Sequence, residues 1–186
     1  MHIAAVWLRS VKQELGAALD IEWQWFALEQ VNSVEGPEWK VWERPAGHRS
    51  RSLLAFSAGE AARRQGSEAF ERFHIGLLQA RHVDGLALQE LETVTGVAEQ
   101  SGLDMARFER DLADPTILAS LEREHQEGAQ LGVFGTPTLV FEYGRSAFLK
   151  MRPAPPEDEA LDVFNALRTL VTERTYIAEI KRPTPP

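Results

Sequence analysis

The stretch that most constrains this sequence runs from Gly132 to Phe141, where two glycines and a Thr-Pro pair precede a short apolar run. Gly132 and Gly135 predict the end of a helix, because glycine leaves the backbone free to turn there. Residues 138–141 are β-branched or apolar and predict a short buried strand. Pro137 has no N–H for a sheet ladder, so we expect it to be the first residue of that strand or to lie at a bulge.

The peptide bond before Pro137 decides what this loop can bind. An X-Pro bond in a tight turn that leads into a core strand is where a cis peptide is expected, and we predict one between Thr136 and Pro137. A cis bond would turn the backbone groups of Thr136 outward, able to pair with an extended peptide or a thiol ligand. The alternative is an ordinary helix-to-strand turn with a trans proline, and these residues by themselves leave both open.

Before this loop, the apolar pattern predicts a helix, a strand and a long helical block. Residues 3–16 carry one apolar stripe of helical spacing, and residues 21–28 have the pattern of a strand that enters a core. Glycine and proline punctuate residues 29–49, which are expected to be irregular. The helical block contains these expected segments: residues 50–65, 67–83, 87–102, a short one from Asp104, and 116–130.

After the loop, the sequence predicts a hairpin and one more helix. Tyr143-Gly144-Arg145 is a turn signal between residues 138–141 and a second run at residues 147–151. Residues 157–174 carry leucines and a phenylalanine at helical spacing and predict the last helix. The strands and helices therefore follow one another in the order of an α/β protein with a large helical insertion.

The composition limits the class of protein. A net charge of −8 over 186 residues argues against nucleic acid or an anionic membrane surface as a partner. No stretch approaches the roughly 20 apolar residues that span a bilayer. The start of the sequence lacks the features of a signal peptide, so a cytoplasmic location is expected. The sequence has no cysteine, which removes disulfides, thiolate metal sites and a cysteine nucleophile.

The order of elements resembles a thioredoxin fold without its first strand. The helical block followed by Gly-Thr-Pro-Thr resembles the DsbA-type branch of that superfamily. Four local stretches are also similar to cytosolic DsbA-family proteins: Trp7-Leu8, residues 23–29, residues 134–138 and residues 180–183. The resemblance implies an α/β, thioredoxin-like fold with a DsbA-type helical insertion. Its core would be residues 1–47 and 132–186, and its insertion residues 48–131.

The first strand and the Cys-Pro motif of the family are missing here. In the family, that strand ends in Cys-Pro-x-Cys or Cys-Pro-x-Ala, and the first cysteine is the redox nucleophile. Aligned on Trp7-Leu8, the motif falls before Met1, so we expect an N-terminally truncated chain whose sheet lacks its central strand. Unpaired buried backbone groups cost about 1–3 kcal/mol each. An upstream strand, closure of the sheet, or a second chain in a homodimer is therefore expected to fill the gap.

The resemblance implies a thiol–disulfide oxidoreductase that is redox-silent as given, because no residue can be assigned as its catalytic nucleophile. The implied substrate-binding residues are Gly135, Thr136 and Pro137, with His2 at the start of the first helix. The implied partner is a protein thiol or disulfide, or a small thiol such as glutathione. Two alternatives stay open: a glutathione-dependent enzyme of the 2-hydroxychromene-2-carboxylate isomerase branch, and a non-catalytic thioredoxin-like module that binds peptides.

Two Glu-x-x-His sequences, at residues 71–74 and 122–125, fit another class of site. With Glu60 and Glu92 they would complete the ligand set of a di-iron helix bundle. Charged neighbours share their faces, so we interpret both motifs as solvated helix faces, and Arg63 as a solvated side chain, with no metal site. Three aromatic residues are expected to pack in a core rather than to bind a ligand: Trp23, Trp25 and Phe26.

Overall fold

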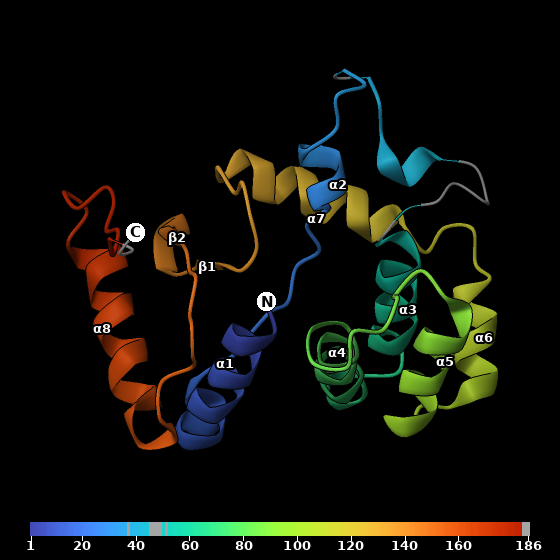
Figure 1. Ribbon diagram of the computed structural model, residues 1–186, viewed down its shortest axis with the longest axis horizontal. Helices are drawn as coiled ribbons and strands as arrows, with labels where there is room; N and C mark the ends of the chain where they lie inside the picture. Colours follow the sequence, from blue (N-terminus) through green and yellow to red (C-terminus); the bar gives the residue numbers. More distant parts are fainter. Residues whose placement is uncertain (37, 45–49, 51, 184–186) are drawn as a thin grey trace. The chain divides into compact units, whose positions relative to one another are not determined.

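The structure is a computed structural model that describes all residues except 37, 45–49, 51 and 184–186 (Figure 1). The described residues are mostly helical and form one two-stranded sheet. The helices are α1 (His2–Leu15), α2 (Leu28–Val31), α3 (Leu53–Arg63), α4 (Ser67–His82), α5 (Leu91–Gln100), α6 (Met105–Leu112), α7 (Ala119–Gln130) and α8 (Ala160–Glu173). The strands are β1 (Thr138–Val140) and β2 (Ser146–Phe148).

The chain divides into two compact units. Unit 1 comprises Met1–His2 and Glu22–Thr136, and unit 2 comprises Ile3–Ile21 and Pro137–Pro186. The helices α3 to α7 therefore belong to unit 1, whereas the sheet and α8 belong to unit 2. The expected boundary between core and insertion, at residues 47–48, lies outside the residues that the structure describes.

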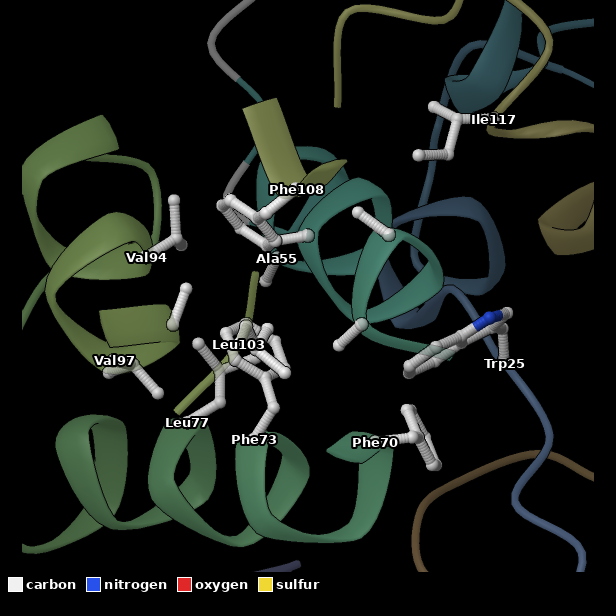
Figure 2. Packing of buried hydrophobic residues seen from close by; sticks show 14 of the residues in the cluster. Trp25, Ala55, Phe70, Phe73, Leu77, Val94, Val97, Leu103, Phe108 and Ile117 are labelled. Atoms are coloured by element: carbon white, nitrogen blue, oxygen red, sulfur yellow. The ribbon is translucent and has the colours of Figure 1, made fainter. Parts of the chain in front are cut away.

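Unit 1 is a helical bundle in which α3 packs against α4, α5 and α6. Figure 2 shows the core around Phe73, Leu103 and Phe108. The face of α3 that enters this core is made of small residues, each at most 7% exposed: Ala55, Ala58, Ala61 and Ala62. Small side chains leave room for the bulky rings of neighbouring elements at the packing density of a protein interior. The helical segments expected for this block are confirmed as α3 to α7, with shifts of a few residues at their ends.

Gly59 shows how tightly this core is packed. A Cβ atom at Gly59 would lie 2.5 Å from Cη2 of Trp25 and 2.9 Å from its Cζ2. The ring is held in place because its indole N–H donates to Oε2 of Glu60 at 3.0 Å. The position therefore has room for glycine alone, although glycine weakens a helix relative to alanine.

We expect Gly59→Ala to lower the free energy of unfolding by about 1–3 kcal/mol, because the added methyl group displaces the Trp25 ring. Gly96→Ala is the matched control, since a Cβ at Gly96 on α5 meets nothing within 4 Å. That control is expected to stabilise by about 0.5–1 kcal/mol. Urea unfolding followed by tryptophan fluorescence measures both changes. Equal unfolding midpoints for the two variants would show that the Trp25 ring moves aside without a loss of stability.

Unit 2 contains most of α1, the β-hairpin and α8. The helix expected at residues 3–16 is confirmed as α1. The indole N–H of Trp7 donates to the carbonyl of Ala160 at 3.0 Å, and its ring lies 6.1 Å from that of Phe164. Phe141, just after β1, places its ring 6.0 Å from Phe164 as well. The first helix and the hairpin therefore both pack on α8.

The predicted hairpin is confirmed. The strands β1 and β2 are antiparallel, with Leu139 opposite Ala147. Tyr143 in the turn has a φ of 60°, which is the left-handed region. The carbonyl of Pro137 accepts the N–H of Leu149 at 3.0 Å. Pro137 thus stands at the start of the ladder, where a residue without an N–H is tolerated.

The strand expected at residues 21–28 does not form. Residues 22–27 have no regular secondary structure, and the chain turns into the short helix α2 at Leu28. An apolar alternating pattern predicts a half-buried extended segment, but a strand also requires the ladder of a neighbouring strand. In this structure the segment is bound by side chains of α3 and α7 instead. One edge of this segment therefore has its backbone groups satisfied by side chains rather than by a neighbouring strand.

Candidate functional site

The loop before the hairpin starts from a well-defined helix end. Gly132 has a φ of 77°, and its N–H donates to the carbonyl of Ala129 at 3.0 Å. The N–H of Val133 donates to the carbonyl of Gly128 at 3.0 Å. These two bonds form a Schellman motif, in which a left-handed glycine ends a helix and satisfies its last carbonyls. The expected role of Gly132 as a helix terminator is confirmed.

The prediction of a cis bond at Thr136–Pro137 is wrong. Among the described residues, the cis peptide bond precedes Pro153 and not Pro137. An X-Pro bond prefers the trans form by about 0.5–1 kcal/mol unless tertiary contacts select cis. The hairpin contact of Pro137 uses only its carbonyl, which is available in either isomer. Gly135 is buried, whereas Thr136 and Pro137 are half-buried.

His2, the other expected binding residue, is the first residue of α1 and is half-buried. It lies near the end of α4, where the pKa of His82 is lowered by burial first and then by the positive charges of the N-terminal amine and His2. In the described part of the chain, no hydrogen bond or ion pair joins His2 to Thr136. The structure thus confirms that His2 begins a helix, and its expected role in binding stays a prediction.

A second polar site, which the sequence did not reveal, surrounds residues 23–27 in unit 1. Nη2 of Arg63 on α3 donates to the carbonyl of Trp23 at 2.7 Å. The N–H of Trp25 donates to Oε2 of Glu124 on α7 at 2.7 Å. Nη1 of Arg63 also pairs with Oε1 of Glu124 at 2.7 Å, so the two side chains are joined to each other. The Arg63–Glu124 ion pair therefore supplies hydrogen-bond partners that a neighbouring strand would supply in a sheet.

His125 extends this arrangement by one residue along α7. Its Nδ1 accepts the N–H of Ala27 at 3.2 Å. Its ring stacks on Phe26, with centroids 4.5 Å apart, and lies 5.2 Å from Trp42. Burial, and then the charge of Lys40, lowers the pKa of His125. The neutral ring suits this position, because a protonated Nδ1 cannot accept a hydrogen bond.

The charge of Arg63 is balanced and covered. Its Nη1 lies 3.2 Å from Oε2 of Glu60, the same oxygen that accepts the indole N–H of Trp25. The guanidinium carbon lies 4.7 Å from the ring centroid of Trp25 and 5.1 Å from that of Phe70. Aromatic faces and two carboxylates make a favourable site for a partly buried guanidinium. We refer to three residues together as the clamp: Arg63, Glu124 and His125.

His74 on α4 lies beside the clamp. Its ring packs 4.5 Å from that of Trp23 and 5.5 Å from that of Phe70. Its Nε2 is buried and has no hydrogen-bond partner among the described residues. Burial, and then the charge of Arg63, lowers the pKa of His74 to about 4. His74 is therefore a neutral residue of the core at physiological pH.

The interpretation of the Glu-x-x-His motifs as solvated faces is wrong for three residues: His74 is 6% exposed, Glu124 5% and His125 7%. Arg63 is not fully solvated either, with 27% of its side chain exposed. Leu121, at helical spacing from Glu124 and His125, was the signal that this face enters the core. Within the described ranges, no group of three or more His, Cys, Asp or Glu side chains could hold a metal ion.

The order of elements, the helical unit and the Gly-Thr-Pro loop ahead of the hairpin define a class of protein. The sequence matches the family described as DSBA-like thioredoxin domain over residues 40–155. This match covers more than half of the chain, and the chain belongs to that family. The expected α/β, thioredoxin-like fold class is confirmed, and the helical structure with its small sheet is consistent with it.

Two relatives are similar to the chain. The uncharacterized protein Rv2286c of Mycobacterium tuberculosis is 26% identical over 182 residues, which are 98% of this chain and 76% of that protein. The ClpXP adapter protein SpxH of Bacillus subtilis is 25% identical over 119 residues, which are 64% of this chain and 39% of that protein. The chain therefore spans well under half the length of the second relative.

Two further facts bear on the family's chemistry. The sequence has no cysteine, so these 186 residues do not supply the thiolate that thiol–disulfide exchange requires. No helix in the part of the chain that the structure describes is both long and apolar enough to cross a membrane.

Proposed function

We propose that the chain is a thiol–disulfide oxidoreductase-type member of the DSBA-like family whose Gly135, Thr136 and Pro137 receive the substrate. The observation that carries this proposal is the family match, which includes the helices α3 to α7 and the whole Gly-Thr-Pro loop. The Schellman motif at Gly132 supports it, because a loop that starts from a rigid helix end is positioned before a ligand arrives. The substrate would be a protein thiol or disulfide, or a small thiol such as glutathione.

His2 completes the proposed binding residues. A helix N-terminus favours a negative charge and lowers the pKa of a thiol near it. His2 is the first residue of α1 and would place an imidazole beside such a thiolate. The chain has no cysteine that could act as the catalytic nucleophile, so we expect these 186 residues by themselves to be redox-silent.

We predict that the purified 186-residue chain does not accelerate the reduction of insulin by dithiothreitol. The reason is that exchange proceeds through a mixed disulfide, which needs a sulfur nucleophile on the protein. Turbidity measured against a buffer blank tests the prediction, with a cysteine-containing thioredoxin as the positive control. A rate above the blank would contradict the proposal that the chain is redox-silent.

Glutathione binding tests the loop under both hypotheses, because the isomerase-type branch uses glutathione as its cofactor and the proposal admits it as a small thiol substrate. Calorimetric titration with glutathione and with S-methylglutathione is the direct measurement. Binding that Thr136→Lys abolishes and Thr175→Lys, at an exposed threonine, preserves would support substrate binding at the loop. Binding that neither variant changes would contradict a role for Thr136.

A second candidate function is that of a non-catalytic module that binds peptides. It is favoured by the relative SpxH, whose name describes it as a ClpXP adapter protein, together with the absence of cysteine here. A screen of immobilised peptides tests it. Binding of peptides without cysteine would favour the module, whereas binding restricted to peptides with a thiol or disulfide would favour the oxidoreductase type.

A further inference from the structure

Residues 22–27 hydrogen-bond to unit 1 through every second residue. The carbonyl of Trp23 accepts from Arg63, and the N–H groups of Trp25 and Ala27 donate to Glu124 and His125. In an extended chain, the N–H and C=O of one residue point to the same side, and those of the next residue point to the opposite side. These hydrogen bonds fall on every second residue, so the segment is extended and one of its edges is bound to α3 and α7.

The opposite edge belongs to Gln24 and Phe26. By the same alternation, their N–H and C=O groups point away from the clamp. No hydrogen bond reaches these backbone groups from any residue that the structure describes. This segment thus has the backbone of an edge strand, with one satisfied side and one open side. We refer to the open side as the 24–26 edge.

The 24–26 edge is held rigid before any partner arrives. Trp25 is fixed by its ring contacts and by its bond to Glu60, and Phe26 is stacked on His125. The side chain of Gln24 donates to Oε1 of Glu22 at 2.6 Å, so the exposed side chains at this edge are also ordered. A strand that is already extended loses little conformational entropy when a second strand pairs with it.

We infer that the 24–26 edge binds an extended peptide segment of another polypeptide, and that this segment carries a basic side chain beside Glu22. The pairing would be β-augmentation, in which main-chain hydrogen bonds give affinity and side chains give specificity. Charge argues for a basic segment: Glu22 is exposed, and the whole chain carries a net charge of −8. This surface uses none of the residues proposed to receive a thiol substrate.

The test measures amide hydrogen exchange by NMR with a defined peptide, acetyl-Thr-Lys-Val-Lys-Val-Thr-amide, titrated up to about 1 mM. We expect the amides of Gln24 and Phe26 to exchange at least tenfold more slowly with the peptide. The amides of Trp25 and Ala27, already bonded to the clamp, should not change. Replacing the lysines of the peptide by glutamate, or methylating alternate backbone nitrogens, should abolish the effect.

Two variants complete the test. Gln24→Pro removes one N–H from the open edge, which an edge strand tolerates, and should weaken peptide binding at least fivefold. Its fold is verified by continued protection of the amides of Trp25 and Ala27. Glu22→Lys should reverse the preference, so that the glutamate peptide binds better than the lysine peptide.

Three results would overturn the inference. The first is no protection of Gln24 or Phe26 at the highest peptide concentration. The second is protection of these amides already in the free protein. Protection that does not depend on protein concentration would show that the chain itself covers the edge, and protection that grows with protein concentration would show that a second copy covers it. The third is peptide binding that Gln24→Pro leaves unchanged.

Discussion

Replacing Glu124 with alanine is expected to lower the free energy of unfolding by about 3–5 kcal/mol. The carboxylate is 5% exposed, accepts the N–H of Trp25 and pairs with Arg63. Its removal leaves a partly buried guanidinium without its nearest counter-charge and a buried N–H without an acceptor, and both are costly. Urea unfolding at neutral pH, followed by tryptophan fluorescence, measures the loss.

Glu127→Ala is the matched control for Glu124→Ala. Glu127 is exposed on the same helix, so its removal is expected to change the free energy of unfolding by less than about 0.5 kcal/mol. Glu124→Gln should fall between the two, because its amide oxygen still accepts the N–H of Trp25 but carries no charge. If Glu124→Ala were as stable as the control, apolar packing of Trp25 would be sufficient to hold the segment.

The protein is expected to lose about 2 kcal/mol of stability between pH 8 and pH 5 through His74 alone, and about 3 kcal/mol by pH 4. Its pKa in the folded protein is lowered to about 4 by burial and then by the charge of Arg63. The unfolded chain, with a histidine pKa of about 6.5, binds the proton first. Stability from His74 is therefore complete above pH ~6.5 and decreases as the pH falls towards ~4.

His125 changes stability in the same direction, since burial and then Lys40 lower its pKa as well. His74→Phe separates the two histidines. Phenylalanine keeps the ring between Trp23 and Phe70 and removes an Nε2 that has no partner in the described structure. The variant should match the parent protein or exceed it at pH 8 and lose less stability by pH 5. Identical pH profiles would contradict the assignment of this loss to His74.

The helices and the hairpin could be predicted from the sequence because their hydrogen bonds are local. Asp104 shows this for a helix start, since its side chain accepts the N–H of Arg107 at 3.0 Å. Gly132 shows it for a helix end, where a left-handed glycine satisfies carbonyls three to five residues earlier. The Tyr143-Gly144 turn shows it for the hairpin, where the left-handed conformation of Tyr143 lies in the turn between the two strands. The family-like order of elements follows from these local signals.

The candidate sites were predicted less completely. Gly135, Thr136 and Pro137 stand in one loop at the head of β1, as the sequence indicated. The isomer of Thr136–Pro137 was predicted wrongly because the intrinsic preference of an X-Pro bond is small and tertiary contacts decide it. The clamp was missed because charged side chains on helices are solvated in most proteins.

The sequence by itself determined the helices, the hairpin and the family, since each depends on spacing within one segment or on the order of segments. The tertiary structure alone decided which groups satisfy the backbone of residues 22–27. Their pattern requires an extended, half-buried segment, but what satisfies its backbone lies far along the chain. Trp25 and Glu124 are 99 positions apart, and no local pattern links an N–H to a carboxylate at that distance. Packing α3 and α7 around the segment brings these groups together, because a buried N–H must find an acceptor.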